Sequence, residues 1–222
     1  MSKKLFIEPH YGDVAWSCAG LIAMNKENSI VVNIFPPRRR YDRLLLKGFT
    51  YRKRKRVEKR FQELFGIRII YLNYESALLR GRTIKELIDT KLNPIEKEQV
   101  AQIRQFISDF VIKEGITEIY SPLAQRNQID HVIVKEAVSG LLTTGCEIYY
   151  YEDFPDFMPK TEKGLITPDL IEKKVDITSV IEEKIQAVIL YESLVRAYFT
   201  SKESLLESIR KSPFETYWLE KS

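Results

Sequence analysis

The fold is decided by the stretch Lys4-Leu5-Phe6-Ile7-Glu8-Pro9-His10-Tyr11-Gly12-Asp13. Its apolar beginning is typical of a buried strand, and residues 14–25 follow it with the spacing of an amphipathic helix. A histidine and a carboxylate therefore stand three residues apart where a strand ends and a helix begins. Open α/β sheets bind their ligands at the carboxyl ends of such strands. The stretch therefore predicts both an α/β fold and the place of its chemistry.

The same alternation continues to residue 153. Strand-like apolar runs alternate with helix-like segments, and glycines follow three of those segments, as they commonly do at helix ends. Such an order predicts βαβ units and a mainly parallel sheet. We expect strands at 4–7, 30–35, 68–72, 118–121 and 147–151, and helices at 14–25, 50–65, 94–114 and 131–143.

Residues 154–222 depart from this pattern. We expect a proline-rich loop over 155–170, helices at 177–199 and 201–211, and a short aromatic tail at 214–219. The chain has 222 residues, which fits one domain, and it contains no repeat and no linker-like segment. We therefore predict a single domain over 1–222, with a core at 1–153 and a C-terminal helical extension at 154–222.

The composition points to the cytoplasm. No apolar run approaches the roughly 18 residues of a membrane span. The N-terminal apolar run is too short for the core of a signal peptide. The two cysteines, Cys18 and Cys146, make no disulfide framework. We therefore expect a cytoplasmic protein without a membrane partner.

The chain has only two histidines, His10 and His131, and both stand in polar turns between a strand and a helix. With Asp13 they would offer two imidazoles and one carboxylate, the ligand set of many catalytic zinc sites. Other divalent metals could also use this set. The alternative is that Asp13 caps a helix and that both histidines are ordinary polar residues at loop ends. Spacing alone leaves both interpretations open.

Two motifs resemble those of the PIG-L/LmbE-like family of zinc-dependent N-deacetylases. The family pattern Pro-His-X-Asp-Asp corresponds to residues 9–13, and its His-X-Asp-His pattern corresponds to residues 128–131. Other pieces of the chain follow in the family's order, including Tyr151-Glu152-Asp153-Phe154-Pro155. The resemblance implies a Rossmann-like three-layer fold and the removal of an acyl group from an amino sugar. It also implies zinc as the cofactor, held by His10, Asp13 and His131.

The departures from the motifs concern the residues that handle protons. The family's general base is the first aspartate of the pair, and here that position is Gly12. The first histidine of the second motif is here Gln128, which can donate a hydrogen bond but cannot transfer a proton. The resemblance thus implies an intact ligand set with weakened or altered catalysis.

Neighbouring polar residues have two interpretations each. Asp130 could orient a metal ligand, or it could cap the helix that follows. Glu8 is an extra carboxylate near the site that we interpret as structural rather than as a substitute base. Tyr11 could fill the space left at Gly12 or supply a phenol. We assign Gln128 and Asp130 to catalysis.

A basic segment lies between Arg38 and Arg60. It holds twelve Lys or Arg against two acidic residues, a local net charge of +10 in a chain whose total is +4. The segment could bind an anionic small substrate, since arginine forks suit oxyanions. It could also be a solvated helix face. Nucleic acid is not expected, because no recognition motif accompanies the charge. We assign Tyr11, Gly12, Arg52 and Arg56 to substrate binding.

The sequence therefore predicts a metal-dependent amide hydrolase that acts on an N-acylated amino sugar or a related small metabolite. The alternative is a non-hydrolytic enzyme of a specialised biosynthetic pathway, or a metal-binding pseudoenzyme, on the same fold. The identity of the substrate and the oligomeric state stay open.

Overall fold

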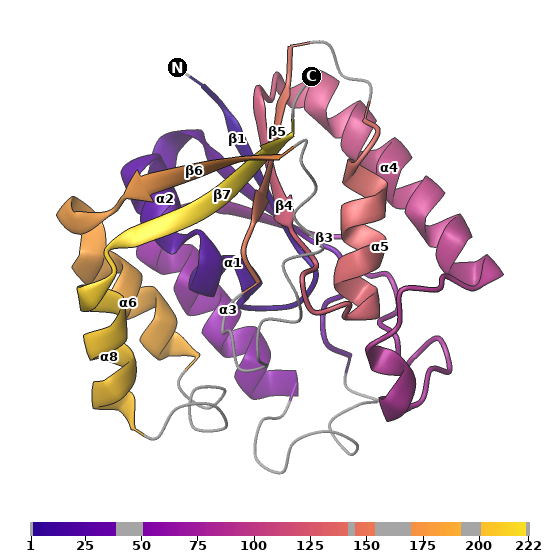
Figure 1. Ribbon diagram of the computed structural model, residues 1–222, viewed down its shortest axis with the longest axis horizontal. Helices are drawn as coiled ribbons and strands as arrows, with labels where there is room; N and C mark the ends of the chain where they lie inside the picture. Colours follow the sequence, from indigo (N-terminus) through magenta and orange to yellow (C-terminus); the bar gives the residue numbers. More distant parts are fainter. Residues whose placement is uncertain (1, 39–50, 142–144, 154–169, 192–200, 221–222) are drawn as a thin grey trace.

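The computed structural model describes residues 2–38, 51–141, 145–153, 170–191 and 201–220. Within them, strands and helices alternate from the N-terminus as the sequence predicts (Figure 1). The strands are β1 Lys4–Glu8, β2 Ser29–Asn33, β3 Arg68–Tyr71, β4 Glu118–Pro122, β5 Glu147–Tyr151, β6 Leu170–Asp176 and β7 Phe214–Glu220. The helices are α1 Asp13–Ser17, α2 Ala19–Met24, α3 Tyr51–Phe65, α4 Pro94–Glu114, α5 Ile129–Val138, α6 Ile181–Leu190 and α8 Lys202–Lys211. Short 3₁₀ turns are η1 Lys26–Asn28, η3 Ile84–Leu87 and η5 Thr178–Val180.

The described strands form one sheet with the order β3-β2-β1-β4-β5-β7-β6. The pairs from β3 to β5 are all parallel, whereas β7 runs antiparallel to both β5 and β6. The expected Rossmann-like α/β fold with a mainly parallel sheet is therefore confirmed. Strand order reverses beside β1, which pairs with β2 on one side and with β4 on the other. Such a switch point opens a crevice at the carboxyl ends of the strands.

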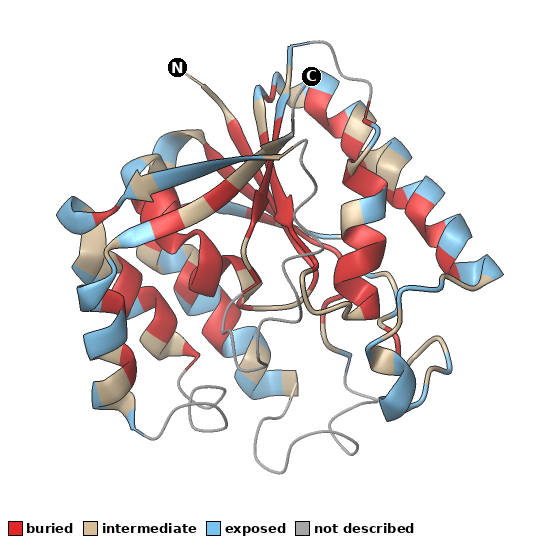
Figure 2. Cartoon of the chain, in the orientation of Figure 1, coloured by how far each residue is buried: buried red, intermediate tan, exposed pale blue. Residues whose placement is uncertain are grey.

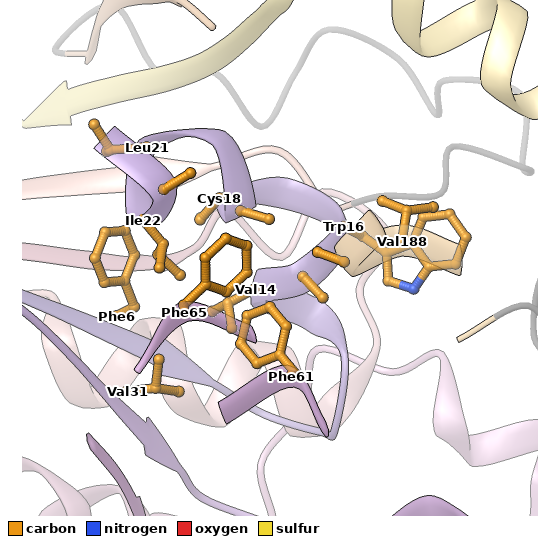
Figure 3. Close-up of a cluster of buried hydrophobic side chains, with 14 of the residues drawn as sticks. Phe6, Val14, Trp16, Cys18, Leu21, Ile22, Val31, Phe61, Phe65 and Val188 are labelled. Atoms are coloured by element: carbon orange, nitrogen blue, oxygen red, sulfur yellow. The ribbon is translucent and has the colours of Figure 1, made fainter. Parts of the chain in front are cut away.

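Helices cover both faces of the sheet (Figure 1). One face packs against α4 and α5, and the other packs against α1, α2, α3 and α6. The central strands are buried on both sides (Figure 2), which explains their continuous apolar runs. Figure 3 shows Phe61 of α3 and Val14 of α1 meeting within the second of these layers, with Val188 of α6 beside Trp16.

The C-terminal region contributes strands as well as helices. β6 and β7 extend the sheet, and β7 pairs Tyr217 with Tyr151 of β5. The aromatic tail is thus a strand that the sequence pattern did not identify as one. Of the helix expected at 177–199, residues 181–190 are helical and residues 192–199 lie outside the described part, as do most of the loops at 36–50 and 155–170. The pairing of β7 with β5 supports the proposal that 1–222 is one domain.

The first expected helix is divided in two at Cys18. The carbonyl of Trp16 accepts a hydrogen bond from the Lys184 ammonium, so it is not available to Gly20. The N–H groups of Gly20 and Leu21 instead donate to the Glu215 carboxylate, both at 2.8 Å. Because strand β7 supplies Glu215, the tail and the helix that follows the first motif are held together.

Candidate metal centre

Three potential metal ligands converge at the switch point. His10 follows β1, Asp13 begins α1, and His131 lies in the first turn of α5, which follows β4. One ligand atom from each residue lies within 4.8 Å of the other two. Asp13 Oδ2 is 3.8 Å from His10 Nδ1 and 3.5 Å from His131 Nε2. The structure therefore brings together the three residues that the motifs indicated.

A tight turn places Asp13 next to His10. The Asp13 carboxylate accepts a hydrogen bond from the backbone N–H of His10 at 2.7 Å, which closes the turn between β1 and α1. Gly12 has φ +99°, a conformation that residues with a side chain rarely adopt. Asp13 is the first residue of α1, but its side chain bonds back to His10 instead of capping the helix, and its Oδ2 faces both imidazoles.

A buried carboxylate holds the far nitrogen of each histidine. His10 Nε2 lies 2.9 Å from Asp130 Oδ2, and His131 Nδ1 lies 2.8 Å from Asp153 Oδ1. A carboxylate only accepts hydrogen bonds, so these two nitrogens carry the hydrogens. The ring nitrogens that face the cluster are then His10 Nδ1 and His131 Nε2. Carboxylates orient metal-binding histidines in this way in many metal sites.

Asp130 is therefore an orienting residue rather than a helix cap. The N-cap position of α5 belongs to Gln128, and Asp130 bonds to His10, not to its neighbour His131. The Asp130 carboxylate also accepts from the N–H of Ala77 and from Arg80 Nη2, the latter at 2.7 Å. Burial opposes its charge, but the contacts with His10 and Arg80 prevail and keep the pKa of Asp130 below its ordinary value. These contacts favour the orienting role of Asp130 over the helix cap.

Two negative charges face His131. Burial lowers the pKa of this imidazole, but the carboxylates of Asp13 and Asp153 outweigh burial and raise the pKa to about 9. The metal-free protein consequently carries a protonated His131 at neutral pH. A metal ligand must offer a neutral imidazole, so binding of a metal has to displace this proton.

This charge state predicts a measurable proton release. At pH 7.5, zinc binding should release about one proton from His131, and zinc affinity should rise as the pH increases toward 9. Calorimetric titrations in two buffers with different ionisation enthalpies measure the proton count. A binding enthalpy that is the same in both buffers would contradict a protonated His131.

The donor set fits a divalent metal. Two imidazole nitrogens and one carboxylate oxygen are three protein ligands of the kind that catalytic zinc sites use, with a fourth position left for water or substrate. Among the described residues this is the one group of three or more His, Cys, Asp or Glu arranged to hold an ion. It bears out the expectation of a metal-binding site.

Four other residues keep their assignments as proposals, and the structure shows the surroundings of each. Gln128 is half-buried at the start of α5, and its backbone bridges to Ile88. Tyr11 packs edge-on against Tyr71, with ring centroids 5.7 Å apart. Arg52 and Arg56 lie on the exposed face of α3, as expected for a solvated helix face.

Several residues of the site were not singled out from the sequence. Asp153 follows β5 within a quoted motif, and its position after a strand was an available signal. Arg80 came from a loop without a recognisable pattern. Glu58, which lies between basic residues of α3, and Tyr191, at the end of α6, carried no signal, because their relevance arises from packing against Glu8 and Gly12.

Three similar proteins place this chain among known folds. A curated relative, the 2'-N-acetylparomamine deacetylase of Streptomyces fradiae, is 25% identical over 225 residues, which cover 94% of this chain and 77% of the relative. The zinc-inhibited form of the teicoplanin deacetylase Orf2 has a TM-score of 0.76, with 16% identity over 98% of this chain and 97% of that one. The 4-carboxy-2-hydroxymuconate hydratase of Pseudomonas putida KT2440 has a TM-score of 0.56, with 17% identity over 99% and 95% of the two chains. No family model matches the chain.

The fold and the three converging ligands resemble those of PIG-L/LmbE-like deacetylases. The curated relative and the solved deacetylases confirm the resemblance that the two motifs indicated, and they support the expectation of a hydrolase. The hydratase shows that the fold by itself does not determine the reaction. Within the described residues, no helix is long and apolar enough to cross a membrane.

Proposed function

We propose that this protein is a zinc-dependent deacetylase that removes an acyl group from an N-acylated amino sugar or a related small metabolite. The observation that carries the proposal is the convergence of His10, Asp13 and His131, with a buried carboxylate behind each imidazole. The deacetylation named for the Streptomyces fradiae relative supports the substrate class.

The residues of the chain would divide the work as follows. His10, Asp13 and His131 hold the metal, and Asp130 and Asp153 fix the two imidazoles. A bound zinc ion polarises a carbonyl and lowers the pKa of a coordinated water to about 7. We assign to the Gln128 amide the donation of a hydrogen bond to the oxyanion that develops on the acyl carbonyl.

The proposed hydrolysis is slow. A positioned acid or base is worth roughly 10²–10⁴-fold in rate. Gly12 has no side chain, and Gln128 cannot transfer a proton. An anionic group on the substrate is a further part of the proposal, and the positive charge of Arg52 and Arg56 would suit such a group.

Release of acetate tests this function. The zinc-loaded protein is incubated with 2'-N-acetylparomamine and with N-acetylglucosamine, and acetate is measured over time. We expect slow release that His10→Ala abolishes and that Asp176→Asn, at the end of β6, leaves unchanged. If the zinc-loaded wild type releases no acetate from either compound, or if His10→Ala releases it as fast as wild type, the proposal is wrong.

A non-hydrolytic enzyme on the same fold is the second candidate. It is favoured by the combined presence of Gly12 and Gln128 at the two positions where the family has proton-handling residues. The hydratase with the same fold is a precedent for a different reaction on this architecture. Zinc binding without acetate release would favour this candidate.

A further inference from the structure

The space beside Gly12 is occupied by an aromatic ring. A Cβ atom added to Gly12 would lie 2.8 Å from Cδ1 and 2.9 Å from Cε1 of Tyr191. Real Cβ atoms essentially never approach other atoms so closely. Position 12 therefore excludes a side chain for two reasons, its φ of +99° and the Tyr191 ring.

Tyr191 has little freedom to move away. It follows α6, only 1% of its surface is exposed, and its ring packs against Phe61 of α3 with centroids 6.3 Å apart. Its hydroxyl donates a hydrogen bond to Glu58 Oε2 at 2.7 Å. Since both the ring and the hydroxyl are held, a side chain at position 12 would have to displace a packed residue rather than the end of a flexible one.

Behind the ring lies a sealed pair of carboxyl groups. Glu58 and Glu8 are 1% and 0% exposed and interact electrostatically with each other, and Glu8 accepts a hydrogen bond from the Asn33 amide at 3.1 Å. Burial raises the pKa of Glu58 to about 7 despite the hydrogen bond from Tyr191, and burial together with the charge of Glu58 raises the pKa of Glu8 well above its ordinary value. Neither carboxyl group is accessible to a substrate, which agrees with a structural role for Glu8.

We propose that Tyr191 determines the catalytic type of this site: its ring takes the volume in which a side chain at position 12 would begin, so the site operates without a carboxylate there. The catalytic part of this proposal rests on the proposed function, whereas the packing part does not. A general base cannot be restored by changing Gly12 alone, because Tyr191 has to be removed as well.

A double-mutant cycle on thermal unfolding tests the packing. The variants are Gly12→Asp, Tyr191→Ala and their combination, with Gly145→Asp as the matched control. Gly145 has φ +83° and nothing within 4 Å of an added Cβ, so it reports the cost of the backbone conformation alone. We expect Gly12→Asp to lower Tm by about 5–10 °C more than the control does, because overpacking adds to strain.

In the Tyr191→Ala background the same change at position 12 should lower Tm no more than the control change does. In the Tyr191→Phe background, which keeps the ring and removes the hydroxyl, the full penalty should persist. If Tyr191→Ala does not fold, Tyr191→Val replaces it in the cycle. If Gly12→Asp lowers Tm by the same amount in Tyr191→Ala as in wild type, the proposal is wrong.

Acetate release from N-acetylglucosamine, measured with the same proteins loaded with zinc, tests whether removing Tyr191 allows a general base at position 12. We expect the combined variant to hydrolyse at least about 10²-fold faster than Tyr191→Ala alone, as a newly placed general base would require. A combined variant that binds zinc but is no faster than Tyr191→Ala would overturn the catalytic part. A third outcome is possible, in which the Tm effects of the two changes are coupled but no variant releases acetate, wild type included. That outcome would support the packing inference and count against the proposed function.

Discussion

Replacing His131 by alanine should lower zinc affinity by at least about 10²-fold. Protein-bound zinc is held by roughly 10–16 kcal/mol in sites with four protein ligands, so the loss of one ligand removes a few kcal/mol. His131 is buried, and its Nε2 faces Asp13 Oδ2 at 3.5 Å, so the alanine variant removes one of the three potential ligands of the cluster. Competition with a chromogenic chelator measures the change.

Asp153→Asn should lower zinc affinity less than His131→Ala does, because it keeps all three ligands. The amide can still accept a hydrogen bond from His131 Nδ1 but no longer carries the charge that favours this tautomer, so we expect affinity to fall by about 10–100-fold. Asp176→Asn removes a carboxylate at the end of β6, outside the cluster, and should leave zinc affinity unchanged. Equal effects of the two aspartate changes would show that Asp153 does not orient His131.

The sequence predicted the parallel part of the sheet because buried strands and glycine-terminated helices are local patterns. It did not identify β6 or β7 as strands. β6 is largely exposed, and Glu172, Lys173 and Lys174 give it no apolar run. The break at Cys18 was also not predictable, since it depends on Lys184 and Glu215, which are more than 160 residues away.

The ligands of the candidate site could be predicted because the chain contains only two histidines and both lie in recognisable motifs. The residues that orient the ligands could not. Asp130 was noticed beside His131 yet contacts His10, because helix α5 directs it toward β1. Tyr191 and Glu58 influence position 12 only through the packing of α6 and α3, and no spacing in the sequence reports such contacts.

Arg80 should contribute to zinc binding without touching the metal ligands. Its side chain is 1% exposed and lies between Asp130 Oδ1, at 2.7 Å, and Glu96 Oε1, at 3.3 Å. The guanidinium also faces the ring of Phe35, with its carbon 5.3 Å from the centroid. Because Asp130 holds His10 Nε2, removal of Arg80 should loosen the orientation of His10 and weaken zinc binding by about 10–100-fold.

Arg82 provides the matched control within the same loop. It bonds to Glu96 Oε2 and to Asp89, at 2.5 and 2.9 Å, and within the described part of the chain it forms no ion pair with Asp130. Arg80→Gln and Arg82→Gln both disrupt the ion pairs of Glu96, so both should destabilise the fold. Only Arg80→Gln should lower zinc affinity. Arg80→Lys keeps the positive charge but loses the two-pronged geometry of the guanidinium. Its zinc affinity should therefore lie between those of Arg80→Gln and wild type.

An NMR measurement of the His10 tautomer shows whether Arg80 orients His10 or only stabilises the fold. With ¹⁵N-labelled histidine, the metal-free protein gives signals from only two imidazoles, one that donates a hydrogen bond to Asp130 and one that donates to Asp153. Arg80→Gln should change the His10 signal and leave the His131 signal as it is, while Arg82→Gln should change neither. If both arginine variants lower zinc affinity equally, or if the His10 signal is the same in Arg80→Gln and wild type, then Arg80 stabilises the loop and does not position the ligand.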